Sequence, residues 1–118
     1  MDTSEVRAEH KFDRIALDKY LARHLRGYPS NSNENLVVRQ YRHGQSNPTF
    51  YMRKGSQEFV MRKKPPGKLL RHAHQVEREF DFTEALHKVG FPVATPLHLC
   101  QDVSVVGTEF YIMEHVQV

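Results

Sequence analysis

Residues 41–64 restrict the possible folds of this chain more than any other stretch, because strand patterns alternate there with tight turns. The stretch reads Y-R-H-G-Q-S-N-P-T-F-Y-M-R-K-G-S-Q-E-F-V-M-R-K-K. Its second turn, residues 54–57, is typical of a β-hairpin. Its first turn is rich in residues that tolerate a positive φ or cap backbone amides, namely Gly44, Gln45, Ser46 and Asn47. The pattern therefore predicts three consecutive strands joined by two turns.

The third of these strands places Arg62 and Lys63 close to the first turn. A loop of free backbone N–H groups beside a fixed cation is a common way for a protein to bind polyphosphate. One glycine is a weak signal by itself, so the prediction of a phosphate site depends on the order of the elements around it.

The rest of the chain predicts two helices and two more strands. Asp13 is placed to N-cap the first helix and Gly27 to end it. The expected elements are a helix over 13–26, strands over 35–43, 49–53 and 58–63, a helix over 72–89, and strands over 95–100 and 109–116. This order predicts an α+β fold, with a five-stranded antiparallel sheet, one helix inserted after the third strand and one helix before the first. This order of elements is that of the small lobe of a kinase-like fold.

Glu79 is the unusual member of the second helix. It lies on or beside the apolar stripe that includes Val76 and Leu86. A carboxylate in such a place needs a cation, and Arg62 or Lys63 could supply it. A Glu at the rim of the sheet that pairs with Arg78 or with solvent is an equally good interpretation of the spacing.

Length and composition limit the other possibilities. The chain has 118 residues, which suits one domain, and no apolar run long enough to span a membrane. No targeting signal is evident, and a single cysteine, Cys100, cannot form an internal disulfide, so an intracellular, reducing compartment is expected.

Net charge is +3, with the basic residues concentrated over 53–78. A solvated face is the default interpretation and an anion site the sharper one, and without interleaved aromatics we expect no nucleic acid partner.

Two further constellations do not predict a catalytic or metal site. His72 and His74 stand two apart and so do not share a helix face, and no third ligand has suitable spacing. Cys100 lies in an apolar strand pattern with no activating group in view, which is typical of a small buried residue.

Several segments together resemble the aminoglycoside/choline-kinase-like phosphotransferase family. They are Q-Y-R-H-G-Q-S-N-P-T-F-Y, E-F-V-M-R-K-K-P-P-G-K-L-L, H-Q-V-E-R-E-F, G-F-P-V-A-T-P and V-G-T-E-F-Y-I-M-E-H-V-Q. More closely, the chain is similar to the N-terminal segment of the acyl-CoA dehydrogenase family members 10 and 11, nearest to member 11. The resemblance covers residue 10 to the end, and K-K-P-P-G followed by the R-E-F helix makes it specific.

The resemblance assigns roles to matching positions. It implies that four groups of residues bind the cofactor. The phosphate-covering loop is Gly44, Gln45, Ser46 and Asn47, and the strand cation Arg62 pairs with Glu79 on the helix. The adenine pocket includes Val60 and Met113, and the hinge includes Glu114 and Val116. Arg62 stands where kinases have Lys, and Arg can still hold phosphate. The resemblance favours the ion pair of Arg62 with Glu79 over the rim alternative.

The same resemblance implies what the chain does not contain. The Asp that orients the acceptor hydroxyl, and the Asn and Asp that hold Mg²⁺, belong to a second lobe beyond residue 118. We therefore expect residues 1–11 to be a flexible leader and residues 12–118 to be an incomplete domain without its C-terminal lobe. No catalytic or metal-binding residue is expected in the chain.

The implied cofactor is ATP with Mg²⁺, and FAD would belong only to the dehydrogenase domain of a larger parent protein. The implied function is the ATP-binding small lobe of a phosphotransferase that phosphorylates a hydroxylated acyl-CoA in fatty-acid breakdown, in a peroxisome or mitochondrion. Whether the chain acts as an enzyme is left open, and the alternative is a non-catalytic interaction or scaffold module. A lobe without its partner is also expected to self-associate.

Overall fold

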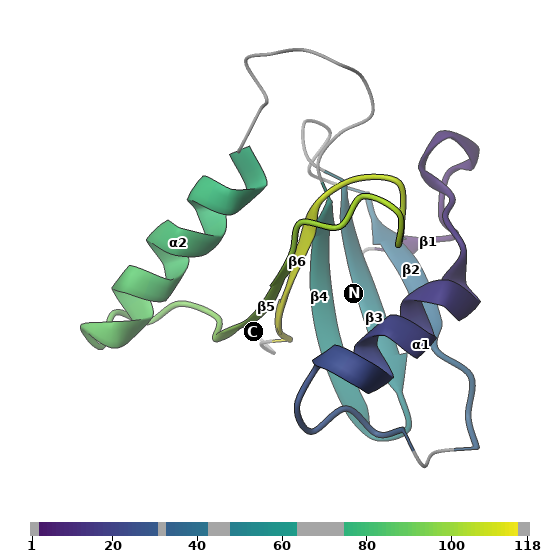
Figure 1. Ribbon diagram of the computed structural model, residues 1–118, viewed down its shortest axis with the longest axis horizontal. Helices are drawn as coiled ribbons and strands as arrows, with labels where there is room; N and C mark the ends of the chain where they lie inside the picture. Colours follow the sequence, from purple (N-terminus) through teal and green to yellow (C-terminus); the bar gives the residue numbers. More distant parts are fainter. Residues whose placement is uncertain (1–2, 31–32, 43–47, 64–74, 116–118) are drawn as a thin grey trace.

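The computed structural model describes residues 3–30, 33–42, 48–63 and 75–115, and within them a six-stranded antiparallel sheet with two α-helices. The strand order is β1-β2-β3-β4-β6-β5 (Figure 1). The strands are β1 (Thr3–Ser4), β2 (Val37–Tyr41), β3 (Thr49–Lys54), β4 (Gln57–Lys63), β5 (Pro96–Cys100) and β6 (Phe110–Glu114). The helices α1 (Arg14–His24) and α2 (Gln75–Lys88) lie on opposite sides of the sheet (Figure 1).

The predicted five-stranded sheet is present, and a sixth strand adds to it at the β2 edge. Thr3 pairs with Tyr41, and a short 3-10 helix, Ala8–His10, follows. The side chain of Gln40 ties this segment down, because its Oε1 accepts from the Arg7 amide at 2.9 Å and its Nε2 lies 2.8 Å from His10 Nδ1. These contacts attach residues 3–10, part of the segment expected to be a leader, to the edge of the sheet.

The helix α1 covers one face of the sheet. Asp13 caps it as predicted, with its carboxylate accepting from the Ala16 amide at 3.0 Å. The helix ends at His24, two residues before the predicted end, and Gly27 adopts a φ of 82° in the following turn. A single core of aliphatic and aromatic side chains joins this helix to the sheet and includes Leu17, Leu21, Phe50, Met52, Phe59, Met61, Phe110 and Ile112. Cys100 also belongs to this core, as expected from its apolar surroundings.

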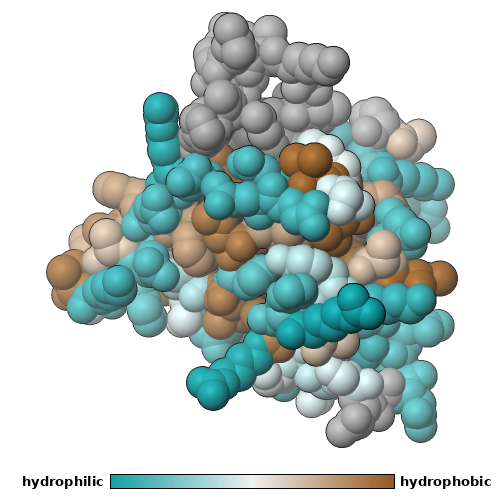
Figure 2. Space-filling view, in the orientation of Figure 1, coloured by the Kyte–Doolittle hydropathy of each residue, from teal (hydrophilic) through white to brown (hydrophobic). Residues whose placement is uncertain are grey.

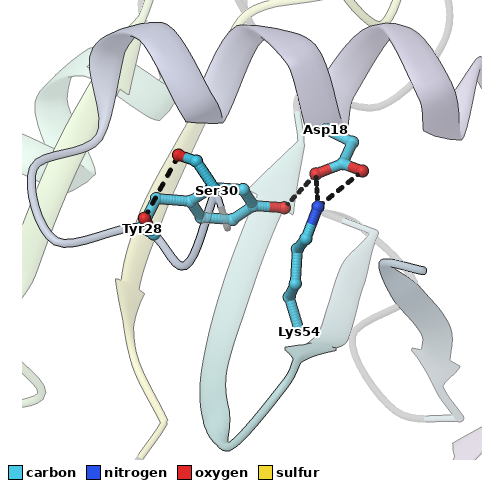
Figure 3. A network of polar contacts seen from close by, with 4 residues as sticks. All are labelled: Asp18, Tyr28, Ser30 and Lys54. Carbon is cyan, nitrogen blue, oxygen red and sulfur yellow. Dashed lines mark hydrogen bonds and ion pairs between the residues drawn. The ribbon is translucent and has the colours of Figure 1, made fainter. Parts of the chain in front are cut away.

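An ion pair between buried Lys54 and partly buried Asp18 fixes the far end of the β3–β4 hairpin to α1 (Figure 3). Lys54 Nζ donates to both carboxylate oxygens of Asp18, at 2.7 and 2.9 Å, and the Tyr28 hydroxyl donates to Asp18 Oδ1 at 2.6 Å. Burial raises the pKa of Asp18, but the hydrogen bonds from Lys54 and Tyr28 outweigh it, so the net shift of the pKa is downward. The contacts hold α1 in one register on the sheet.

The helix α2 ends in a Schellman motif. Gly90 has a φ of 82°, its amide donates to the His87 carbonyl at 3.0 Å, and the Phe91 amide donates to the Leu86 carbonyl at 3.0 Å. Val76 is buried, whereas Val89, the last residue of the expected helix over 72–89, lies just after α2 and is exposed. Neither helix in the described part of the chain has the length and apolar character that a membrane span requires.

Candidate nucleotide-binding face

The face of the sheet opposite α1 carries the side chains that the sequence pointed to. Along β4, Phe59, Met61 and Lys63 turn toward α1, so Val60 and Arg62 turn the other way. The strand register arranges this face in rows, because residues paired across neighbouring strands point to the same side. One row is Tyr51–Val60–Met113, and the next is Thr49–Arg62–Tyr111.

The second row contains an ion pair with α2. Arg62 Nε lies 3.2 Å from Glu79 Oε2, and the two side chains keep 33% and 28% of their exposure to solvent. The Tyr111 hydroxyl donates to the same Glu79 oxygen at 3.4 Å. Burial, and then the negative charge of Glu79, raises the pKa of Tyr111 to about 12, so the phenol stays protonated near neutral pH. The structure therefore contains the predicted Arg62–Glu79 pair rather than a rim Glu.

Lys63, the alternative partner for Glu79, lies on the other face. Its ammonium stands over the rings of Phe12 and Phe50, at 5.0 and 5.9 Å from their centroids. Its side chain is buried, and burial lowers its pKa. Alternation along the strand explains the outcome, because two consecutive residues cannot face the same helix.

The first row is the less polar part of this face. Val60 and Met113 pair across β4 and β6, and both remain partly exposed. Tyr51 lies beside Val60, and its hydroxyl donates to Glu58 Oε2 at 2.5 Å. His115 lies at the end of this row beside Tyr51 and Glu58. Its ring centroid is 5.3 Å from that of Tyr51, and its Nδ1 is 3.9 Å from Glu58 Oε1. An apolar strip thus lies between a cationic pair on one side and a Tyr–Glu–His group on the other.

Of the remaining residues predicted to bind the nucleotide, only Glu114 lies within the described part of the chain. Glu114 follows Met113 on β6, and its amide donates to the Thr95 carbonyl at 2.9 Å, so a backbone contact from Glu114 to a base would have to come from its carbonyl oxygen. A hollow of about 440 Å³ beside this end of the sheet includes Glu114 and His115 but neither Val60 nor Arg62. The loop residues Gly44, Gln45, Ser46 and Asn47, the hinge residue Val116, and His72 and His74 lie outside the described residues.

Sequence reasoning missed Tyr111 and the group of Tyr51, Glu58 and His115. Strict alternation over residues 109–116 would have placed Tyr111 on the same face as Met113, and so toward Arg62. The contacts of Tyr51 with Glu58 and His115 depend on the register of three strands, which alternation alone does not supply. Over residues 3–30, 33–42, 48–63 and 75–115, no three His, Cys, Asp or Glu side chains converge in a way that could hold a metal ion.

Several known proteins have sequences similar to this chain. Residues 37–118 match the profile of the "Phosphotransferase enzyme family". The chain is 60% identical over 116 residues to acyl-CoA dehydrogenase family member 11 of Mus musculus, and 54% identical to that of Homo sapiens, with 98% of this chain covered in each case. Member 10 of Mus musculus is 46% identical over 114 residues. The chain spans only 15% of the length of the member 11 proteins.

The fold of this chain is also similar to that of a solved structure. The crystal structure of a putative aminoglycoside phosphotransferase from Ralstonia eutropha JMP134 matches with a TM-score of 0.73 and 39% sequence identity. The match covers 91% of this chain and 29% of that one. These findings confirm the resemblance read from the sequence, to the phosphotransferases and to members 11 and 10. The chain belongs to the phosphotransferase enzyme family, and its fold is that of the family's kinase-like N-terminal lobe.

Proposed function

We propose that this chain binds ATP on the face opposite α1, as the small lobe of a phosphotransferase. The observation that carries the proposal is the Arg62–Glu79 ion pair, at 3.2 Å, one row away from the partly exposed Val60 and Met113. A cation held by a carboxylate suits phosphate, and an adjacent apolar strip suits a purine ring. Family membership supports nucleotide binding in general.

The described residues fit part of an ATP molecule. Arg62 would contact the phosphates, Val60 and Met113 would contact the adenine ring, and the carbonyl of Glu114 would face its edge. The loop with Gly44, Gln45, Ser46 and Asn47 and the hinge residue Val116 belong to the same proposal on the basis of sequence. ATP with Mg²⁺ would supply the phosphoryl group and neutralise its charge.

The acceptor is proposed from the relatives. Their names describe acyl-CoA dehydrogenases, and this chain matches 15% of their length. In such a parent protein the lobe would accompany a dehydrogenase domain that uses FAD, and the phosphotransferase would act on a hydroxylated acyl-CoA in fatty-acid breakdown. A peroxisomal or mitochondrial location belongs to the same proposal.

Nucleotide titration tests the proposal. We expect MgATP to bind to the chain, measured by isothermal titration calorimetry, and Arg62→Ala to weaken binding by about tenfold, because a charge-assisted contact to phosphate is lost. Arg23→Ala is the matched control, since Arg23 is an exposed arginine on α1, on the other side of the sheet. Equal affinities for the two variants would contradict a phosphate-binding role for Arg62.

We further propose that this polypeptide alone transfers no phosphoryl group. Among the described residues no carboxylates converge as metal ligands, and phosphoryl transfer requires such ligands to hold Mg²⁺. A coupled ADP-release assay with purified chain should show no turnover above background. Catalytic turnover that Arg62→Ala abolishes would disprove this.

A non-catalytic interaction module is the second candidate, favoured by a different observation. Phe82 on α2, and Val89 and Phe91 just after it, are all exposed aromatic or aliphatic side chains. Exposed apolar groups of this kind suit a protein partner. Binding of MgATP by the unaltered chain would favour the phosphotransferase lobe over this candidate, and its absence would favour the module.

A further inference from the structure

Tyr111 joins both members of the ion pair on the proposed nucleotide face. Its strand position is paired with Arg62 across β4 and β6, so the two side chains leave the sheet side by side. Its hydroxyl donates to Glu79 Oε2 at 3.4 Å, the same oxygen that lies 3.2 Å from Arg62 Nε. Arg62, Glu79 and Tyr111 therefore form a three-membered polar group centred on one carboxylate oxygen.

The phenol of Tyr111 is more rigid than the two charged side chains. Tyr111 is buried, whereas Arg62 and Glu79 are each about one-third exposed. Its ring packs edge-on against Phe80, with centroids 5.9 Å apart, and Phe80 is the neighbour of Glu79 on α2. A tyrosine has two side-chain torsions, and this one is held by a strand on one side and a ring on the other. The hydroxyl is thus a donor in a fixed position, whereas the Glu79 and Arg62 side chains have several rotamers and lose conformational entropy when they are ordered.

We propose that Tyr111 is a positioning residue for the phosphate-binding cation: it holds Glu79 in one rotamer, and Glu79 in turn holds Arg62 toward the phosphates of the nucleotide. This inference rests on the proposed function, since it assigns Arg62 to phosphate. Tyr111 itself touches no ligand in this proposal. Its effect is to reduce the ordering that Arg62 must undergo when a phosphate binds.

The plainer interpretation is that the hydroxyl of a buried tyrosine simply needs a hydrogen-bond partner, and Glu79 is nearby. The two interpretations differ in what the loss of the hydroxyl would do. If the hydroxyl is merely structural, its loss would lower stability and would lower the affinity for every ligand equally. If the hydroxyl positions Arg62, its loss would lower the affinity for each ligand in proportion to that ligand's phosphate contacts, and the affinity for the nucleoside would not change.

The experiment measures the affinities of ATP, ADP and adenosine for the full chain and for Tyr111→Phe, which retains the ring against Phe80. We expect Tyr111→Phe to lower the affinity for ATP and for ADP by about three- to tenfold, and the affinity for adenosine by less than about twofold. Tyr51→Phe is the matched control, because it removes a hydroxyl on the same face that donates to Glu58 instead of Glu79. It should leave the ratio of ATP to adenosine affinity unchanged. An equal loss for all three ligands, or no loss, would overturn the inference.

A second measurement separates this inference from the proposed function. A double-mutant cycle with Arg62→Met and Glu79→Gln measures their coupling in urea unfolding, without any nucleotide. We expect the coupling to fall by about half in the Tyr111→Phe background, because the shared oxygen loses the donor that fixes it. If the unaltered chain binds none of the three ligands, the proposed function fails, and the cycle still decides whether Tyr111 holds the pair. An unchanged coupling would overturn the positioning role in either case.

Discussion

At the scale of single residues, the ion pairs of this chain differ mainly in how much water reaches them. Lys54 is largely buried beside Asp18, the Arg62–Glu79 pair is about one-third exposed, and the Lys88–Glu84 pair on α2 is mostly in solvent. An exposed pair contributes at most about 1 kcal/mol, whereas breaking a buried pair costs about 3–5 kcal/mol. The order of exposure therefore predicts an order of stability effects.

The Arg62–Glu79 pair should give an intermediate effect. We expect Glu79→Gln to lower the free energy of unfolding by about 1–2 kcal/mol, because the pair lies between the buried and exposed limits. Glu84→Gln is the matched control on the same helix, and its effect should be below about 0.5 kcal/mol. Urea denaturation followed by circular dichroism measures both. Equal shifts for the two variants would mean that the pair with Arg62 has no special stabilising role.

The Asp18 carboxylate should make stability depend on pH in a defined direction. Burial raises its pKa and the hydrogen bonds from Lys54 and Tyr28 lower it more, so the folded pKa lies below the ordinary value of 3.8. The unfolded chain then binds this proton more readily than the folded chain, and the stabilisation is present above about pH 4 and lost as pH falls through the folded pKa. At pH 7, Asp18→Asn should cost about 3 kcal/mol, since it leaves the buried Lys54 ammonium without its carboxylate.

Unfolding of Asp18→Asn and the unaltered chain at pH 7, 5 and 3 provides the test. The two should differ most at pH 7 and 5, and the difference should narrow at pH 3, because the unfolded chain then takes up the Asp18 proton more readily than the folded chain, in which Lys54 stabilises the carboxylate. Asp81→Asn, at an exposed position of α2, should change stability by less than about 0.5 kcal/mol throughout. A difference at Asp18 that is independent of pH would show that the carboxylate charge is not what stabilises this contact.

At the scale of elements, the end of α2 depends on one left-handed residue. Gly90 has a φ of 82°, and no heavy atom lies within 4 Å of where a Cβ would be, so a side chain there meets backbone strain but no clash. We expect Gly90→Ala to destabilise the fold by about 1 kcal/mol and Gly90→Asn by less, because Asn tolerates the left-handed region better than Ala. Thermal unfolding of both variants measures the difference. Equal losses would show that the φ value is not the cause.

The elements with strong patterns were predicted well from the sequence, and those that depend on tertiary contacts were not. The three strands of residues 41–64 and the capping of α1 by Asp13 follow from alternation, turn residues and a cap, all of which are local. The strand Thr3–Ser4 is too short for any periodicity, and it forms because Gln40 and the β2 edge hold it. The choice of Arg62 over Lys63 was open on spacing, and the strand's two faces decided it.

At the scale of the whole molecule, one face of the sheet is thoroughly buried under α1, and a few apolar side chains are exposed at and after α2. The core between α1 and the sheet includes Phe110 and Ile112, so these side chains of β6 do not contribute to an exposed apolar patch. Three exposed apolar side chains lie on α2 and just after it, where Phe82 is 67%, Val89 78% and Phe91 56% exposed. Figure 2 shows hydrophobic side chains gathered at the left edge of the view, over the outer end of α2. Val89 directly follows the last residue of α2 and stands seven residues, about two helical turns, after Phe82, so the two lie toward the same side of the helix axis.

This surface should cause the isolated chain to self-associate. Burying two large apolar side chains per copy favours association by about 1.5–3 kcal/mol for each, so we expect sedimentation velocity to show larger species as concentration rises, and a hydrophobic dye to bind near neutral pH. The double variant Phe82→Ser, Val89→Ser should remain monomeric and bind less dye. Ile15→Ser is the matched control, because Ile15 is 63% exposed on α1, on the opposite side of the sheet, and its loss should leave association unchanged. A sharp monomer peak at high concentration, with no dye binding and a cooperative melt, would contradict this expectation. It would show that the outer side of α2 is stable in water without a second copy, and it would favour the stand-alone interaction module over the incomplete lobe.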